Sequence, residues 1–453
     1  MTDSVTLRGV SSGAAMGSLI CRVGVLRHPW RTARILRMHG GSLPAAIELG
    51  ALRDERKIAL VRGAEQISYA RLRRALHATA AALADRCEAG GRVGIGIDQS
   101  AASVVLLAAA LAAGLDAVPL GRRLSQHDRD AVADQLRLTD LLDPARDVLW
   151  DGGRQPARAA GQLMILSSGS TGTPRVTGRR SFRLRALIPL ADLDRRIHWP
   201  AGPVLVLAPL DHGHGLSAVV AGFLRGATVL LGAQSPSDEI VAMAADHQPS
   251  CVTGVPMQLA RAVRAGAFDS GHLRLIVSGS SRLQDELAEE MRVRTGARVI
   301  DCLGTTETGT FAVRLPPEGF QPLAGVRLLV DHEHRVIVDT PLADEPTPTG
   351  DTGEVSAAGL HLHGRADGLV DTAGELVSPL RMRRAFESLP QVVSCRIDAV
   401  DDELRGTLLI ARVEVHDSPG VEASDLREAL LPVLGRSGLP QRIDIVSPAQ
   451  RPA

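Results

Sequence analysis

The feature that most constrains the fold is an alternation of helical and strand patterns early in the chain. Residues 69–86 have the spacing of an amphipathic helix, which the Glu-Ala-Gly-Gly stretch at 88–91 ends. Residues 93–97 follow as a short apolar strand, and an Ala/Leu-rich helix begins at Ser100. A helix, a glycine turn, a strand and a second helix in this order are typical of a parallel sheet with crossover helices.

The same alternation continues downstream. Short apolar runs that suit buried strands occur at residues 204–208, 227–231, 273–278 and 299–300. A helical pattern lies between the last two of these runs, at residues 283–295. The sequence therefore predicts an α/β protein whose large N-terminal domain has layered sheets and helices.

The C-terminal part has a different pattern. A Pro/Thr/Gly-rich stretch at residues 344–353 predicts a break in regular structure. Beyond it lie a helical pattern, a strand pattern and a second helical pattern that Pro432 should end, at residues 380–389, 408–415 and 424–431. We expect a basic helical segment, a large domain and, after a hinge, a small α+β domain, with the bounds 1–45, 46–366 and 367–453.

The composition excludes several classes of protein. With 51 basic and 51 acidic residues the net charge is zero, so no overall field attracts nucleic acid. The longest uncharged run, residues 99–115, predicts a buried helix, because a bilayer span needs about 20 apolar residues. Arg22 interrupts the only early apolar stretch, so no signal peptide is expected. Five scattered cysteines without a CxxC pair predict a reducing, cytoplasmic compartment and argue against structural zinc.

The N-terminal segment is basic. Its arginines at positions 22, 27, 31, 34 and 37 lie among apolar residues, and the spacings of three place the last three near one another on a helix. One interpretation is a helix that lies on a membrane surface or on a partner. The other, which we favour from the sequence, is a helix with a solvated basic face, because Trp30 is its only anchoring aromatic residue.

A loop rich in glycine and hydroxyl residues follows the apolar run at 163–166. Its residues are Ser167, Ser168, Gly169, Ser170, Thr171, Gly172 and Thr173, with Arg175 shortly after. Glycines let backbone N–H groups approach an anion closely and hydroxyls add donors, so the loop suits a polyphosphate. It lacks the GK[ST] of a Walker P-loop. The alternative for such a loop alone is a flexible surface turn.

Several stretches together resemble the adenylate-forming superfamily of acyl-CoA synthetases, luciferases and adenylation domains. In chain order they are SSGSTGTPR at 167–175, PLDHGHGL at 209–216, LRLIVSGSSRL at 273–283, CLGTTETG at 302–309, TGD at 349–351 and GRADGLVDTAGELVSP at 364–379. The whole run is most similar to fatty-acyl-CoA synthetases. This order of motifs makes the resemblance specific, although each motif alone would be weak.

The resemblance implies a role for each motif. The loop at 167–175 would bind the ATP phosphates, and His212 would lie beside the acyl pocket. Gly279 and Ser280 would line the substrate and adenine sites, next to Gly304 and Thr305. Thr306 and Glu307 would be catalytic, with Glu307 binding Mg²⁺. Asp351 would hold both ribose hydroxyls, Arg365 would lie near the ribose, and Asp367 would be the hinge.

The chain departs from the family pattern at several positions. Arg175 stands for the loop's usual lysine and Val176 for the glycine after it, while Leu303 replaces an aromatic residue near the adenine. In the hinge motif, Asp371 stands for a lysine and Arg381 for a glutamate. The family's C-terminal catalytic lysine has no counterpart, since Lys57 is the only lysine. The sequence therefore predicts slow adenylation of ordinary fatty acids, unless an arginine such as Arg442 or Arg451 substitutes.

Three functions remain open from the sequence. The first is an ATP-dependent ligase that forms an acyl adenylate with Mg²⁺ and then transfers the acyl group, with CoA as the expected acceptor. The second is a diazotase that activates nitrite for transfer to an aryl amine. The third is a non-catalytic relative that binds nucleotide or acyl ligand. Three His-x-His pairs, at 212/214, 332/334 and 361/363, suit a metal only if a third ligand joins them, and none lies at ligand spacing.

Overall fold

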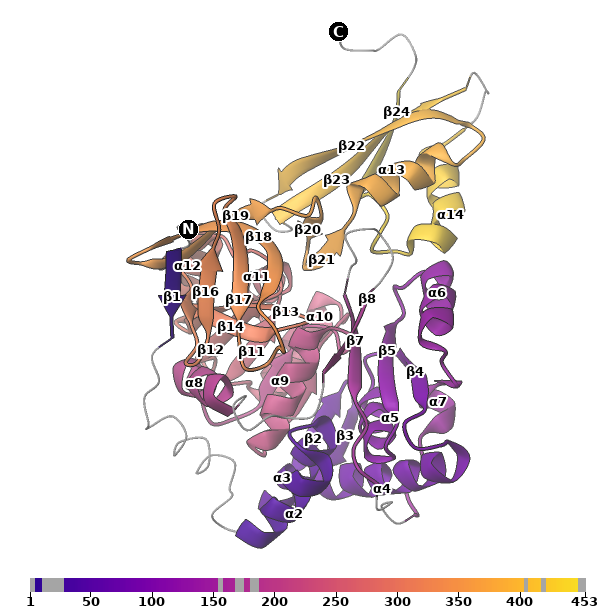
Figure 1. The fold of residues 1–453 in the computed structure, drawn as a ribbon. Helices are drawn as coiled ribbons and strands as arrows, with labels where there is room; N and C mark the ends of the chain where they lie inside the picture. The colour runs from indigo at the N-terminus through magenta and orange to yellow at the C-terminus, as the bar shows by residue number, and fades with distance from the viewer. Residues whose placement is uncertain are drawn as a thin grey trace.

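The computed structural model describes residues 5–9, 28–153, 158–167, 175–179, 187–402, 406–416 and 421–446. Its large N-terminal part has three sheets with helices between and around them, and a smaller C-terminal part lies at one end (Figure 1). The predicted α/β class is confirmed by this architecture. None of the described helices is both long and apolar enough to cross a membrane.

The first sheet has the strand order β6-β4-β5-β7-β8. Its strands are β4 (Arg92–Ile97), β5 (Asp116–Gly121), β6 (Asp140–Leu142), β7 (Leu163–Ser167) and β8 (Arg175–Arg179). Four of them are parallel, and only β8 runs antiparallel to its neighbour. The helices that follow its strands are α5 (Ala101–Ala112), α6 (Gln126–Leu136) and α7 (Pro144–Asp147). This is the predicted parallel sheet with crossover helices.

The second sheet has nine strands in the order β15-β14-β13-β12-β11-β9-β10-β2-β3. Its parallel centre consists of β2 (Ile58–Arg62), β10 (Val229–Leu231), β9 (Val204–Val206), β11 (Cys251–Gly254), β12 (Leu275–Gly279) and β13 (Arg298–Thr305). Antiparallel strands close both edges, namely β3 (Glu65–Ser68), β14 (Gly309–Arg314) and β15 (Gln321–Pro322). The apolar runs at 204–208, 227–231 and 273–278 are thus confirmed as buried strands.

Helices pack between the two sheets and outside them. They are α3 (Leu43–Arg53), α4 (Tyr69–Arg86), α8 (Leu187–Ile197), α9 (Gly213–Leu224), α10 (Ser237–His247), α11 (Pro256–Arg264) and α12 (Asp285–Thr295). Every residue of α5 except Ala102 is buried, in the same core as side chains of α4, β2 and β9. The long uncharged run therefore lies in the centre of the protein, as predicted.

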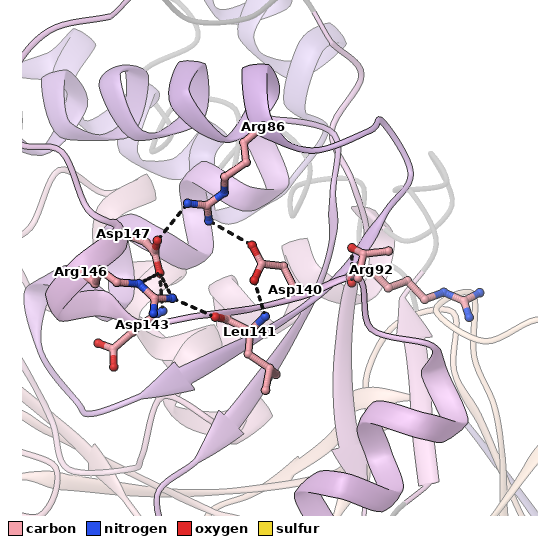
Figure 2. Close-up of polar contacts among 8 residues, drawn as sticks. Arg86, Arg92, Asp140, Leu141, Asp143, Arg146 and Asp147 are labelled. Carbon is pink, nitrogen blue, oxygen red and sulfur yellow. Dashed lines mark hydrogen bonds and ion pairs between the residues drawn. The ribbon is translucent and has the colours of Figure 1, made fainter.

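A set of ion pairs holds the end of α4 against β6 and α7 (Figure 2). Arg86 contacts Asp140 at 3.2 Å and Asp147 at 3.1 Å, and Arg146 contacts Asp147 at 2.9 Å. Burial acts to raise the pKa of Asp147, but the hydrogen bonds from Arg146 and from the amide of Asp143 lower it overall. Such surface pairs are each worth about 0–1 kcal/mol, so they orient these elements more than they stabilise the fold.

The third sheet is antiparallel, in the order β1-β16-β17-β18-β19. Its strands are β1 (Val5–Arg8), β16 (Arg327–Val330), β17 (Arg335–Asp339), β18 (Thr347–Ser356) and β19 (Gly359–Arg365). The predicted break at 344–353 is wrong for its second half, because β18 pairs with strands on both sides. Threonines favour extended backbone, and a register shift after Thr352 accommodates the glycine that follows.

The N-terminal segment also differs from its predicted form. Residues 5–8 form β1, which pairs antiparallel with β16 and so joins the third sheet. The helix α2 (Pro29–His39) confirms a basic helix, but the expected boundary at residue 45 falls inside α3, whose first nine residues are all buried. A helix buried to this extent belongs to the large domain. The sequence could not reveal this, because the apolar residues of α3 do not indicate which other elements the helix packs against.

The C-terminal part has a core of its own, formed by apolar side chains between Val377 and Ile443. Its elements are β20 (Val370–Thr372), β21 (Glu375–Val377), α13 (Pro379–Glu387), β22 (Val392–Asp402), β23 (Gly406–Val415), α14 (Ala423–Leu434) and β24 (Arg442–Val446). Pro432 lies inside α14 rather than ending it, and the helix ends at Leu434 with Gly435 as its C-cap. A proline in the last turn removes only one backbone hydrogen bond, so the helix continues for two residues.

Ion pairs connect this part to α6 and to the loop that precedes it. Arg381 donates to Asp128 at 2.6 Å, and Arg123 contacts Glu375 at 3.2 Å. The helix α14 also lies beside α6 (Figure 1). The arginine that replaces the family's glutamate at position 381 thus has a clear structural role, since it joins the two parts of the molecule.

Candidate active site

Three of the predicted motifs meet at one edge of the nine-stranded sheet. The register pairs Thr253 of β11 with Val206 of β9, Gly254 with Ser278 of β12, and Gly279 with Cys302 of β13. The carboxyl ends of these parallel strands therefore lie side by side. In open α/β sheets, ligands commonly bind at such an edge.

The phosphate loop connects two strands of the first sheet. Ser167 ends β7, Arg175 begins β8, and the two residues are paired in the antiparallel ladder. Ser168, Gly169, Ser170, Thr171 and Gly172 lie outside the described residues. Their predicted contact with the ATP phosphates therefore stays a prediction.

The β13–β14 hairpin carries the CLGTTETG motif. Gly304 and Thr305 end β13, while Thr306 and Glu307, both half-buried, lie in the turn before β14. The Thr305 and Thr308 hydroxyls are 2.9 Å apart, and the amide of Thr308 donates to Thr305 at 3.2 Å. These bonds hold the turn that carries Glu307 in one shape.

Replacing Gly304 with alanine should destabilise this hairpin. A Cβ there would lie 2.5 Å from the carbonyl oxygen of Gly309, which is closer than any real contact. We expect Gly304→Ala to lower the free energy of unfolding by about 1–3 kcal/mol, measured by urea denaturation. Gly364→Ala on β19 is the matched control, because a Cβ there meets nothing within 4 Å. Equal stability of the two variants would contradict the close approach.

Asp351 and Arg365 face each other across β18 and β19. They are paired in the ladder, and Arg365 donates to the Asp351 carboxylate at 3.0 Å. Arg365 also donates to Asp367 at 2.9 Å, and the amide of Leu369 donates to the same carboxylate at 3.2 Å. Burial raises the pKa of Asp351 above its ordinary value, and the Arg365 guanidinium only partly opposes this. One arginine thus orients two carboxylates, both from motifs that the sequence singled out.

Asp371 connects this pair to the edge of the nine-stranded sheet. Its carboxylate accepts from the amide of Gly374 at 3.0 Å and from the Ser281 hydroxyl and Arg282 amide. Burial raises its pKa, and these hydrogen bonds lower it in part. The aspartate in place of the family's lysine therefore holds the β20–β21 hairpin against the turn at Ser280, whose φ of 67° is left-handed. Sequence analysis recorded this departure but not its structural role.

The two histidines of the PLDHGHGL motif have different surroundings. His212 precedes α9 with a side chain that is 43% exposed, 3.8 Å from Asp211. His214, two residues further, lies 2.8 Å from the Thr253 hydroxyl and packs against Gly279, where a Cβ would be 2.7 Å from its Nδ1. Burial lowers the pKa of His214 to about 4, and the nearby His212 adds to this. Sequence analysis chose His212 for the acyl site and missed that His214 is the one enclosed at the sheet edge.

His214 should make the stability of the protein depend on pH. The unfolded chain protonates this imidazole below its ordinary pKa of 6.5, whereas the folded protein does so only near 4. Stability is therefore full above pH 6.5 and is lost as the pH falls toward 4. As the pH falls from 6.5 to 4, the free energy of unfolding of the wild type should fall by about 2 kcal/mol more than that of His214→Gln. His127→Gln, at an exposed position on α6, should follow the wild-type curve, and a parallel curve for His214→Gln would contradict the assignment.

A buried glutamine joins the two parallel sheets beside this motif. Gln99 follows β4 with a left-handed φ of 64° and is 1% exposed. Its amide donates to Asp211 at 3.0 Å and accepts from the amide of Leu210 at 2.8 Å. The loop before α9 is thus fixed between the sheets. The sequence gives no signal for this contact, which spans more than a hundred residues.

The other His-x-His pairs lie away from this edge. His332 and His334 are in the β16–β17 turn, and His361 and His363 are on β19. The rings of His334 and His363 are 6.3 Å apart. Within the parts of the chain that the structure describes, no three His, Cys, Asp or Glu side chains come together as metal ligands.

The fold and this edge define an open α/β protein with a candidate ligand site at the strand ends, and a family comparison identifies it further. The chain belongs to the AMP-binding enzyme family, whose profile matches residues 48–149 and 153–363. The predicted resemblance to adenylate-forming enzymes is thereby confirmed at the level of the family.

Similar proteins include ligases for different acids. The chain is 28% identical over 334 residues to a fatty acid–[acyl-carrier-protein] ligase of Streptomyces coeruleorubidus, in a match that covers 63% of this chain and 64% of the relative. It is 26% identical to a 3-hydroxybenzoate–CoA/4-hydroxybenzoate–CoA ligase of Thauera aromatica, over 60% of this chain and 59% of the relative. The chain thus spans about three fifths of each of these relatives.

Solved structures share the fold. A product-analogue complex of o-succinylbenzoate CoA synthetase from Bacillus subtilis matches with a TM-score of 0.77, covering 90% of this chain and 95% of that structure. The sequence identity is 19%, so this likeness concerns the fold alone.

Proposed function

We propose that this chain is an ATP-dependent, AMP-forming ligase. It activates a carboxylic acid as an acyl adenylate and then transfers the acyl group to the thiol of coenzyme A. The observation that carries the proposal is the half-buried Asp351 carboxylate, paired with Arg365 and connected through Asp371 to the turn at Ser280. A carboxylate has two acceptor oxygens, which suit the two adjacent hydroxyls of a ribose.

The described residues fit a nucleotide and its metal ion. Gly279 and Gly304 lie at this edge in close contact with His214 and with the carbonyl of Gly309, so they fix its shape. Glu307 offers a hard oxygen ligand, and Mg²⁺ commonly takes one or two carboxylates together with phosphate oxygens. Bound Mg²⁺ would neutralise phosphate charge.

The reaction that this arrangement suits has two steps. A carboxylate oxygen attacks the α-phosphorus of ATP, the bond to the bridging oxygen breaks, and pyrophosphate leaves. The thiolate sulfur of the acceptor then attacks the acyl carbon, and AMP leaves. Asp351 and Arg365 would hold the ribose in place through both steps, because the nucleoside stays bound until the acyl group departs.

The comparisons favour this function over the alternatives. The named relatives are ligases for carboxylic acids, and none of them supports the activation of nitrite, which we do not propose further. The fatty acid relative and the aryl acid relative use different acceptors by name, so CoA remains our proposal for the acceptor. We also propose that the protein acts in the cytoplasm.

We further propose that residues 367–453 act as a small domain that turns about Asp367. Their separate core supports this boundary, as does the position of Asp367 between β19 and β20. The contacts of Arg381 and Asp371 with the large domain would then be specific to one orientation.

One experiment tests the function directly. Pyrophosphate and AMP release from ATP are measured with fatty acids, with aryl acids, and with nitrite plus an aryl amine, each with and without CoA. We expect AMP formation that depends on a carboxylic acid, and a thioester only when CoA is present. Release with nitrite alone, or no release with any acid, would refute the proposal.

A further inference from the structure

The outward side of α2 exposes an aromatic residue that the fold does not use. The helix packs through its other side, where Thr32 and His39 are buried. Trp30 is 88% exposed. The other two tryptophans are covered, since Trp150 lies under the Arg71 guanidinium and Trp199 under that of Arg225. We call Trp30 and the three arginines of this helix the outer face of α2.

The arginines of the outer face have no counter-charge among the described residues. Arg31, Arg34 and Arg37 lie at the surface, and none of them makes an ion pair with a residue that the structure describes. Between Ser4 and Ile47 the sequence has six arginines and no Asp or Glu, although the whole chain is neutral. On α12, by contrast, Arg292 and Arg294 pair with Glu289 and Glu290 in the ordinary manner of a solvated helix. The arginines of α2 therefore differ from those of an ordinary solvated helix, which are balanced by acidic side chains.

The chemistry of the outer face indicates that its partner is an anionic surface with an apolar layer beneath it. Arginine binds phosphate and carboxylate groups, and an indole ring partitions to the headgroup level of a bilayer. An 11-residue helix is about 16 Å long and about 10 Å wide, so its outer face offers about 160 Å². A stable protein interface needs about 800 Å² on each partner, whereas a bilayer needs no matching shape. The area therefore favours a lipid surface over an acidic protein.

We propose that α2 docks this protein on a lipid surface that carries anionic headgroups, with Trp30 at the headgroup level and the three arginines on the phosphates. The inference goes beyond the proposed ligase and does not depend on it. Figure 1 shows α2 at the end of the molecule opposite β22 and β24, so contact with a membrane would leave the C-terminal part uncovered.

Vesicle sedimentation tests the proposal with the full chain. We expect the protein to bind vesicles of phosphatidylcholine mixed with phosphatidylserine at low salt, to be released as salt rises, and to stay in solution with phosphatidylcholine alone. An arginine near such a surface contributes roughly fivefold to partitioning, so replacing Arg31, Arg34 and Arg37 with Gln should reduce binding roughly 100-fold. Replacing all three with Lys should retain most of it.

Matched variants separate the outer face from general effects. The triple change of Arg396, Arg412 and Arg442 to Gln removes the same charge from exposed sites on β22, β23 and β24 and should leave binding unchanged. Trp30→Ala should weaken binding, whereas Val293→Ala, at a 67% exposed site on α12, should not. All variants change surface positions, and an unchanged thermal melt confirms that each is folded.

Three results would overturn the proposal. One is the absence of binding to anionic vesicles at low salt. Another is equal loss of binding in the two triple-Gln variants. The third is binding to polyglutamate without binding to vesicles, which would assign the outer face to an acidic protein. A blue shift of Trp30 emission on vesicle addition, absent in Trp30→Phe, would give independent support.

Discussion

Asp351→Asn is expected to weaken ATP binding by about 100-fold. Each hydrogen bond to a charged group contributes about 1.5–3 kcal/mol, and the variant loses the charge of a carboxylate proposed to accept two ribose hydroxyls. Isothermal titration with ATP and with 2′,3′-dideoxy-ATP separates this contact from general damage. The wild type should prefer ATP strongly, whereas the variant should bind both nucleotides with similar weak affinity.

The matched control for this prediction is Asp339→Asn. Asp339 forms an exposed ion pair with Arg327 on the same sheet. Its loss therefore shows how far general damage to this sheet affects ATP binding when Asp351 is intact. Binding should also weaken as the pH falls, because burial raises the pKa of Asp351 and binding needs its ionised form. If Asp351→Asn kept the wild-type preference for ATP over its dideoxy analogue, the ribose role would be wrong.

Glu307→Gln is expected to reduce adenylate formation by about 10²–10³, which corresponds to about 2.7–4 kcal/mol of lost electrostatic stabilisation. The amide keeps the shape of the side chain but offers Mg²⁺ a neutral oxygen in place of an anionic one. Pyrophosphate release measured against Mg²⁺ concentration should reach half of its maximum at a higher Mg²⁺ concentration than in the wild type. The maximum itself should be lower. Glu318→Gln, at an exposed position after β14, should behave as the wild type.

A second measurement separates the metal role from disruption of the hairpin. With a synthetic acyl adenylate and CoA, no pyrophosphate forms and the transfer step needs no phosphate-bound metal. Glu307→Gln should therefore retain thioester formation from the adenylate. Loss of both half-reactions, with an unchanged thermal melt, would assign Glu307 a role other than metal binding.

The sequence predicted well those elements whose signal is local. The helix at 69–86 agrees with α4 at both ends, because Ser68 accepts from the amide of Arg71 as an N-cap and an apolar stripe faces the core. The uncharged run at 99–115 became the buried α5 for the same reason. The motif order predicted the family, and some of its glycines, such as Gly279 and Gly304, lie at strand ends where the backbone has close contacts.

Other features depended on contacts between distant residues. The strand β1 pairs with β16 more than three hundred residues away, and four residues of alternating pattern do not specify such a partner. The stretch at 347–356, with three threonines, two glycines and one proline, became a strand, because neighbouring strands satisfied its backbone groups on both sides. Local composition carried the opposite signal, since proline and glycine ordinarily interrupt strands.

The sequence by itself determined the α/β class, the family and the residues that carry the candidate chemistry, because these follow from local periodicity and from motifs of fixed spacing. Only the tertiary structure decided which residues meet. It enclosed His214 rather than His212 at the sheet edge, placed Asp371 against Ser281, and left Trp30 uncovered. The physical reason is that burial and pairing depend on neighbours from other elements, and an isolated position in a chain does not record those neighbours.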